Sequence, residues 1–450
     1  MTLKRGAHVS ANDTARAAAG LESLVQPLGG LMSQAAPLRA LSGEPSFPTY
    51  GSFLGDLNPV LSPYSRLIES DVNGYNGAGG AIEPELARIR AIAEGLERYS
   101  TCVFDERQFI WATGAELGHE ALDLDTVPRC SETELAHPRC PLVAPDKRLP
   151  IRWVRGVSLF DARPVWLPAV MVYLKLSMLG VGERFTLPIS TGCAAHGTLD
   201  RALLSGIGEV IERDAISLVW LQQMPLPRIE LDATPDWLNG YLERQNRQAG
   251  GVETLLFDAT TDLGIPTVYG LQISPSNQAL AALVMCSTEL DPAQAVAKVI
   301  REAASSRFAL QQPRQVPENW DDFSDISHGA SFMGRPAQLP AFDFLRHSRR
   351  SRRLSEMPVL RTGDARRDLI GVLRTLRERG MEAFAVDLTT DEAMRAGTNV
   401  VRVVIPALQP LSVSYRARYL GHPRLYDAPQ RMGYLVRAEG EINPWPQPFA

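Results

Sequence analysis

The stretch that decides the fold is Ser190-Thr191-Gly192-Cys193-Ala194-Ala195-His196-Gly197-Thr198, which leads directly into the segment 199–220. The stretch predicts a glycine-containing loop, and the segment after it predicts one long helix. On that helix Ser205, Glu209 and Glu212 are four and three residues apart, so they share one face. Because unpaired carboxylates are costly to bury, we expect this face to lie outside the core. Two carboxylates beside an apolar stripe suit a divalent cation that carries phosphates.

A second loop-and-helix unit precedes this one. The stretch Asn73-Gly74-Tyr75-Asn76-Gly77-Ala78-Gly79-Gly80 is glycine-rich, which predicts either a plain flexible turn or a backbone that approaches a ligand closely. A helix is expected over 86–102, and its motif Glu94-x-x-Glu97-Arg98 has the spacing of Glu209-x-x-Glu212-Arg213. One such motif is common on solvated helices. Two copies, each after a Gly-containing loop, indicate an internal repeat of function.

Strands and helices alternate in the rest of the chain. Asp291 and Pro292 predict the N-cap and first residue of a third helix. Two expected strands precede it at 268–274 and 279–287, and two more are expected at 153–160 and 165–174. The repeated order of strand, strand and helix predicts an α+β fold, with helices packed on mixed or antiparallel sheets.

Composition limits the classes of function. The chain has 450 residues and a net charge of -5, which gives no overall attraction to nucleic acid or to an anionic membrane. No apolar run reaches the roughly 18 residues of a membrane span. The five cysteines include no CxxC pair, so neither a zinc site nor a disulfide framework is indicated. A reducing cytoplasm is the expected compartment.

The two ends of the chain differ from its centre. Residues 1–48 are rich in Ala, Leu, Gly and Pro and are expected to form a partly mobile extension before one domain, 49–450. The tail 443–450 has proline at every second position from Pro444 to Pro448, which favours an extended conformation. It is either disordered or docked through Trp445 and Phe449.

These motifs resemble those of the YcaO superfamily. The two Glu-x-x-Glu-Arg motifs, the block 190–214 and Glu302-x-x-x-x-Arg307 are similar to its three nucleotide-binding motifs. The segments 403–410 and 421–426 are similar to the streptolysin-type D-protein branch, and the proline tail is similar to that of azoline-forming members. The resemblance covers roughly residues 50–450 and implies a YcaO-like fold around a central nucleotide site.

The resemblance implies an ATP-dependent cyclodehydratase that converts Cys, Ser or Thr of a ribosomally made precursor peptide into thiazoline or oxazoline rings. It implies that Mg²⁺ is held by Glu94, Glu97, Glu209 and Glu212. The residues expected at the nucleotide are Gly77, Gly79, Arg90, Arg98, Ser190, His196, Ser205, Arg213, Glu302 and Arg307. The tail residues expected to shape the catalytic site are Pro444, Pro446, Pro448 and Ala450.

Some positions depart from the family pattern. Ala78 and Gly79 stand where a lysine is frequent, and Arg90, Arg201 and Ser305 also replace common residues. These departures leave two alternatives open, namely ATP-dependent thioamide or amidine formation and a nucleotide-binding scaffold without catalysis.

The resemblance also implies partners. A leader-gripping domain is not recognised in the sequence, so we expect a separate leader-binding protein that resembles ubiquitin-activating (E1-like, ThiF-like) enzymes. An FMN-dependent azoline dehydrogenase is a further expected partner. We expect a homodimer within such a complex.

Overall fold

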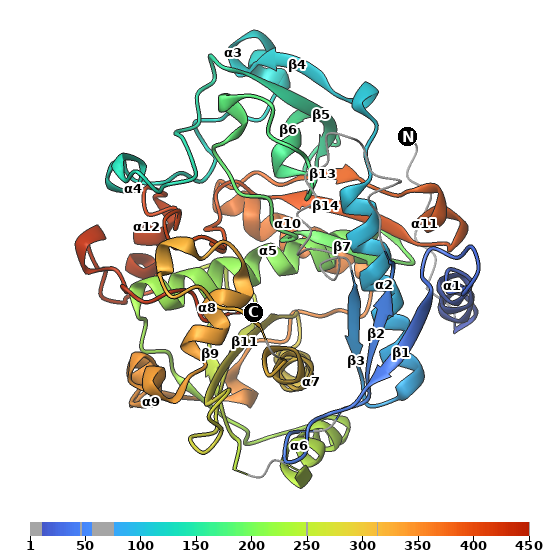
Figure 1. Cartoon of the computed structure of the whole chain (residues 1–450), viewed down its shortest axis with the longest axis vertical. Helices are drawn as coiled ribbons and strands as arrows, with labels where there is room; N and C mark the ends of the chain where they lie inside the picture. Colours follow the sequence, from blue (N-terminus) through green and yellow to red (C-terminus); the bar gives the residue numbers. More distant parts are fainter. Residues whose placement is uncertain (1–10, 46, 56–75, 249–250, 313, 450) are drawn as a thin grey trace.

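The fold consists of three sheets with helices packed on them (Figure 1). The computed structural model describes residues 11–45, 47–55, 76–248, 251–312 and 314–449. All strand pairs are antiparallel except β8 with β12, which confirms the predicted α+β class. The three-stranded sheet contains β1 (Gln34–Leu38), β2 (Thr49–Phe53) and β3 (Gly77–Gly80). The five-stranded sheet contains β8 (Arg228–Glu230), β9 (Glu253–Asp258), β10 (Thr267–Ile273), β11 (Ala282–Thr288) and β12 (Ser351–Arg353). The six-stranded sheet contains β4 (Ile110–Thr113), β5 (Pro150–Ser158), β6 (Pro164–Pro168), β7 (Cys193–His196), β13 (Phe384–Asp387) and β14 (Asn399–Val404).

Three long helices connect these sheets. They are α2 (Pro84–Cys102), α5 (Leu199–Gln222) and α7 (Pro292–Leu310). All three were predicted, and the Asp291 carboxylate accepts a hydrogen bond from the backbone N–H of Ala293, as expected of an N-cap. The other helices are α1 (Ala11–Glu22), α3 (Gly114–Leu117), α4 (Glu132–Ala136), α6 (Asp236–Gln248), α8 (Ile326–Met333), α9 (Asp343–Arg346), α10 (Ala365–Glu378), α11 (Asp391–Arg395) and α12 (Arg424–Arg431).

Helix α5 is the central element. It packs against β7 and β14 of one sheet and against β11 of another, with α10 and α12 beside it (Figure 1). Its second half is almost wholly buried because Ile216, Leu218 and Trp220 enter the largest hydrophobic cluster. A helix enclosed in this way holds its polar residues at fixed places between two sheets.

The glycine-rich stretch before α2 is a strand, which corrects the expectation of a loop. A Cβ atom at Gly79 would overlap the Ala87 carbonyl oxygen and the Ala91 amide nitrogen, and one at Gly77 would overlap the Ala91 carbonyl oxygen. These glycines therefore allow β3 to lie directly on α2. The part at 73–75 lies outside the described residues.

The strand expected over 165–174 was also too long. Strand β6 ends at Pro168, and a 3-10 turn follows at Ala169–Met171. Proline lacks the N–H that would continue the ladder, so the break falls there.

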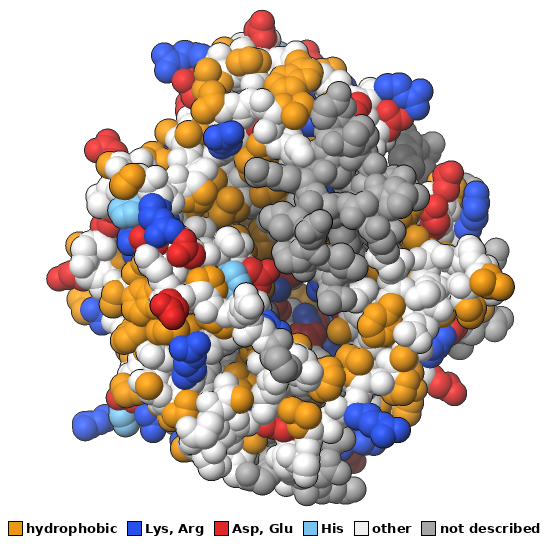
Figure 2. Space-filling view, viewed as in Figure 1, with side chains coloured by type: hydrophobic (Ala, Val, Ile, Leu, Met, Phe, Trp, Pro, Cys, Tyr) orange, Lys and Arg blue, Asp and Glu red, His pale blue; other side chains and the backbone are white. Residues whose placement is uncertain are grey.

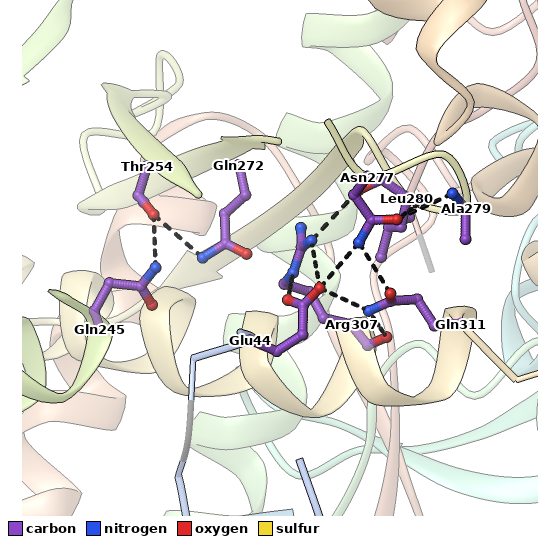
Figure 3. Close-up of polar contacts among 9 residues, drawn as sticks. All are labelled: Glu44, Gln245, Thr254, Gln272, Asn277, Ala279, Leu280, Arg307 and Gln311. Carbon is purple, nitrogen blue, oxygen red and sulfur yellow. Dashed lines mark hydrogen bonds and ion pairs between the residues drawn. The ribbon is translucent and has the colours of Figure 1, made fainter. Parts of the chain in front are cut away.

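The described part of the N-terminal extension is packed onto the rest of the protein. Strand β1 pairs with β2, and Glu44 forms an ion pair with Arg307 of α7. Figure 3 shows the Glu44 carboxylate among Arg307, Gln311 and Asn277, whose side chains all donate to it. Residues 34–45 thus belong to the same packed body as α7.

We expect Gly79→Ala to destabilise the protein by about 1–3 kcal/mol, the usual cost of overpacking. Gly371→Ala is the control, because a Cβ at that helical position meets nothing within 4 Å. This substitution should leave the free energy of unfolding unchanged or raise it by at most about 1 kcal/mol. Urea unfolding of both variants would measure this. Equal stability of Gly79→Ala and the parent protein would contradict the packing explanation.

Candidate functional site

The two repeated motifs make the same contact with the glycine-containing segment that precedes each of them. Glu94 Oε2 accepts a hydrogen bond of 2.7 Å from the backbone N–H of Ala78. Glu209 Oε2 accepts one of 2.9 Å from the backbone N–H of Gly192. The repeat inferred from the sequence therefore corresponds to a repeated geometry, in which a backbone N–H holds the first glutamate of each motif.

The arginine of each motif holds the other oxygen of the same glutamate. Arg98 Nη2 lies 2.7 Å from Glu94 Oε1, and Arg213 Nη2 lies 3.4 Å from Glu209 Oε1. Because these side chains are partly buried, the ion pairs hold the two carboxylates in fixed positions. Arg98 and Arg213, which were expected at the nucleotide, thus order the glutamates.

The second glutamate of each motif, Glu97 on α2 and Glu212 on α5, is influenced by burial and by carboxylates of neighbouring helices. Burial raises the pKa of Glu97 well above its usual range, and the nearby carboxylates of Glu209 and Glu94 raise it further. Burial also raises the pKa of Glu212 to about 7, with smaller contributions from Glu302 and Glu209. Carboxylates of α2 and α5 therefore act on one another, as do those of α5 and α7, and a cation near them would relieve this repulsion.

Glu212 is buried, which corrects the expectation that its face lies outside the core. Its side chain is only 5% exposed, and Oε2 accepts a hydrogen bond from the Thr288 N–H. Lys298 of α7, which the sequence analysis did not identify, places Nζ 3.5 Å from the same oxygen. Burial alone would lower the pKa of Lys298, but Glu212, Glu302 and Glu289 raise it overall. The signal in the sequence that could have identified Lys298 is its position four residues before Glu302, which places both side chains on the same face of the helix.

The donor set fits Mg²⁺ bound together with phosphates. Carboxylate oxygens are the hard ligands that Mg²⁺ prefers, and their mutual repulsion would be relieved by the ion. In the described part of the chain, no group of three or more His, Cys, Asp or Glu side chains is placed so that it could hold a metal ion by itself. Such a site suits an ion that takes one or two protein carboxylates and completes its shell with phosphate and water oxygens.

A cavity of about 230 Å³ lies between α5 and α7. Its polar lining includes His196, Arg201, Ser205, Glu209 and Lys298, and its apolar lining includes Leu204, Ile211, Ile265, Leu290 and Val372. Figure 2 shows a hollow near the centre of one face of the molecule, with acidic and basic side chains at its bottom. A cavity with one polar and one apolar part matches a nucleotide, which has phosphates at one end and a base at the other.

Two other predicted residues have defined protonation states. Burial and the neighbouring Arg201 lower the pKa of His196 to about 4, so the ring is neutral at pH 7. Arg90 donates to the Gly80 carbonyl at 2.7 Å, and burial and Arg301 lower its pKa to about 10, so it remains a cation. His196 is thus suited to donate or accept one hydrogen bond, and Arg90 to attract an anion.

The remaining predicted residues differ in their surroundings. Glu302 pairs with Arg301 at 2.9 Å on α7. Ser190 accepts a hydrogen bond from the Cys193 N–H through its carbonyl and so closes the turn before β7. Arg307 is fully buried and pairs with Glu44, so we assign it to the packing of residues 34–45 and leave it out of the proposed phosphate contacts.

The proline tail is docked and reaches Arg213. The Pro444 carbonyl accepts from the Tyr415 hydroxyl, and the Trp445 carbonyl accepts from the Trp220 indole. Pro446 and Pro448 are buried, and the Arg213 guanidinium lies 4.4 Å from the centre of the Phe449 ring. The tail thus contacts an arginine of the candidate nucleotide site, whereas Ala450 lies outside the described residues.

Comparison with known proteins agrees with this site. Residues 78–409 match the family model described as YcaO cyclodehydratase, ATP- and Mg²⁺-binding. The matched part covers most of the chain and includes all three long helices. The chain therefore belongs to the YcaO family, whose members bind ATP and Mg²⁺.

The sequence identity to individual relatives and solved structures is low. An uncharacterised protein of Methanothermobacter thermautotrophicus is 29% identical over 387 residues, which are 84% of this chain and 90% of that protein. A heterocyclase solved in complex with substrate and cofactor has a TM-score of 0.77 at 20% identity; the match covers 100% of this chain and 59% of that one. A chain of the E. coli microcin synthetase McbBCD complex has a TM-score of 0.64 at 14% identity, with 95% of this chain and 99% of that one covered. These structural similarities establish the YcaO fold.

One further property of the chain concerns membranes. Within the parts that the structure describes, no helix is long and apolar enough to cross a membrane.

We expect the stability of the protein without Mg²⁺ and nucleotide to fall as pH rises from about 5 to 8. The pKa of Glu212 rises from 4.5 to about 7 on folding. The contribution of Glu212 to the free energy of unfolding is therefore complete below pH 4.5 and is lost as the pH rises through about 7. The shift is equivalent to roughly 3 kcal/mol. Urea unfolding at several pH values should show a smaller decline for Glu212→Gln. Parallel profiles for the two proteins would contradict the burial of an ionisable Glu212.

Proposed function

We propose that this chain uses ATP and Mg²⁺ to convert Cys, Ser or Thr residues of a precursor peptide into thiazoline or oxazoline rings. In this reaction the side-chain sulfur or oxygen attacks the preceding carbonyl carbon, and the amide oxygen leaves as phosphate after it has taken the γ-phosphoryl group of ATP. The attacking thiol or hydroxyl and the amide nitrogen each lose a proton, so the peptide loses one water per ring. ATP supplies the phosphoryl group that turns a poor leaving group into a good one.

The observation that carries this proposal is the convergence of the two Glu-x-x-Glu-Arg motifs. Phosphoryl transfer depends mainly on positioning and on neutralising charge. Glu97 and Glu209 provide oxygens that would hold Mg²⁺, while Glu94 and Glu212 stand beside them. Lys298, Arg201 and Arg90 provide cations for phosphate oxygens, and none of these roles needs a protein nucleophile.

Cys193 is not a candidate nucleophile. It lies buried on β7, and burial raises the pKa of its thiol to about 12 although Arg402 lies beside it. A thiol in this state is unreactive at neutral pH. The absence of a thiolate agrees with a reaction whose nucleophile belongs to the peptide.

The docked tail supports ring formation over the other ATP-dependent reactions considered for this chain. Phe449 covers Arg213, and the neighbouring prolines follow a fixed path along α5 and α8. A Cβ atom at Gly329 of α8 would overlap the Gln447 carbonyl, so the tail lies close against that helix. We propose that Pro444, Pro446, Pro448 and Ala450 shape the space in which the peptide is cyclised.

We further propose that the protein works with a separate E1-like leader-binding protein, as a homodimer, and together with an FMN-dependent azoline dehydrogenase. Support comes from the fold that it shares with a chain of the microcin synthetase complex, which is an assembly of several chains. Co-purification of this chain with candidate leader-binding proteins would test the first of these partnerships.

We expect Glu209→Gln to lower ATP turnover by at least about a hundredfold, because it weakens both the Mg²⁺ ligand and the pair with Arg213. Glu378→Gln on the exposed face of α10 is the control and should leave turnover unchanged. Circular dichroism would verify that both variants are folded. Full turnover by folded Glu209→Gln would remove this residue from the site.

Mass spectrometry of the peptide product separates the proposal from its alternatives. The account predicts loss of one water per modified residue with consumption of one ATP. Exchange of oxygen for sulfur would instead indicate thioamide formation. Binding of ATP with no mass change in any peptide tested with the complete complex would indicate a scaffold.

Removal of residues 444–450 should abolish ring formation while most nucleotide affinity remains, because the tail touches Arg213 whereas the proposed Mg²⁺ ligands lie on α2 and α5. Ring formation is measured by product mass and nucleotide binding by calorimetry. A truncated protein with full cyclisation activity would refute the proposed role of the tail.

A further inference from the structure

A second cavity lies on the other side of α5 from the candidate nucleotide pocket. Its volume is about 80 Å³, and its walls include Phe185, Leu187, Ile189, Val210, Val403 and Leu408. Glu209 lines the nucleotide pocket and the next residue, Val210, lines this cavity. The segment 189–193 forms part of its wall, and Glu209 holds that segment through Gly192. The two cavities therefore both border α5.

Arg402 of β14 places a buried positive charge at this cavity. The residue is 7% exposed, and Nη1 donates to the Ile189 carbonyl at 2.6 Å and to Cys193 Sγ at 3.0 Å. Its Nε is buried and has no hydrogen-bond partner. Among the described residues, no carboxylate pairs with Arg402. A buried cation without an anion and with a free donor is costly unless a ligand completes it.

Thr191 and Tyr419, which also line the cavity, have energetically unfavourable features as well. The Thr191 hydroxyl is buried without a hydrogen-bond partner. Tyr419 is 2% exposed and has a φ of 58°, a left-handed conformation that is unfavourable for a bulky residue. Strain of this kind persists where the surroundings enforce it and is concentrated at ligand sites. Arg402, Thr191 and Tyr419 thus form a polar site in an otherwise apolar cavity, and hydrogen-bond donors of Arg402 and Thr191 in this site have no partner in the protein.

We propose that this cavity binds a backbone amide of the peptide substrate, with Arg402 and Thr191 donating to its carbonyl oxygen and the apolar walls receiving the adjacent α-carbon. The inference rests on the proposed function, because it assigns the place of the peptide relative to the nucleotide. The cavity is about half the size of one that holds benzene, roughly 150 Å³, so a nucleotide does not fit. Its apolar walls disfavour a hydrated phosphate and favour a neutral amide.

Thr191→Val tests this assignment. The hydroxyl has no partner in the protein, so a purely structural role predicts unchanged or slightly higher stability and unchanged ligand binding. The proposal predicts about three- to tenfold weaker binding of N-methylacetamide, which has the size of a single peptide group; this is the loss expected for one hydrogen bond. Binding is followed by NMR chemical-shift titration of the full-length protein, and inorganic phosphate is titrated in parallel.

Thr398→Val is the matched control, because its hydroxyl is also buried and unpaired but does not line this cavity. It should leave binding of N-methylacetamide unchanged. Equal affinity of Thr191→Val and the parent protein, no binding of the amide to the parent protein, or binding of inorganic phosphate alone at this cavity would each overturn the proposal.

Calorimetry with Mg²⁺ and ATP keeps this inference separate from the proposed function. Nucleotide binding without binding of the amide would overturn the peptide cavity and leave the proposed function standing. Binding of the amide that is weakened by Thr191→Val, in a protein that does not bind ATP, would support the cavity and contradict the proposed function.

Discussion

The structure depends on carboxylates that are held close together although they repel one another. Each first glutamate of the repeated motifs is fixed twice, by a backbone N–H of the segment before its helix and by the arginine four residues later. The second glutamates are thereby brought into a region where burial and neighbouring charge favour their neutral forms. Holding these groups ready costs free energy in the ligand-free protein, and a cation with phosphates would offset that cost.

The rest of the fold serves to maintain this arrangement. Helix α5 is enclosed by two sheets and by α10 and α12, so Glu209 and Glu212 have little freedom to move apart. Helix α2 lies directly on β3 because glycines allow the approach, which places the Ala78 N–H within reach of Glu94. Helix α7 adds Lys298 as a permanent counter-charge, and Glu44 anchors that helix to residues 34–45.

Much of this could be predicted from local signals. The N-cap at Asp291, the strand pair before it and the matching motif spacing all depend on residues near one another in the sequence. The departures depend on tertiary packing, which spacing does not reveal. The burial of Glu212 depends on Lys298, 86 residues later in the chain, and the pairing of Arg307 depends on Glu44 from the N-terminal segment. The glycines of β3 were interpreted as ligand-facing because a close neighbouring helix gives the same sequence signal.

A crystal structure with a non-hydrolysable ATP analogue and Mn²⁺ in place of Mg²⁺ tests the central claim most directly. The account predicts an anomalous-scattering peak that is coordinated by at least one carboxylate of α2, one of α5 and the phosphates of the analogue. A nucleotide bound elsewhere, or a metal held by the phosphates alone while Glu94, Glu97, Glu209 and Glu212 keep their positions without contacting it, would contradict it.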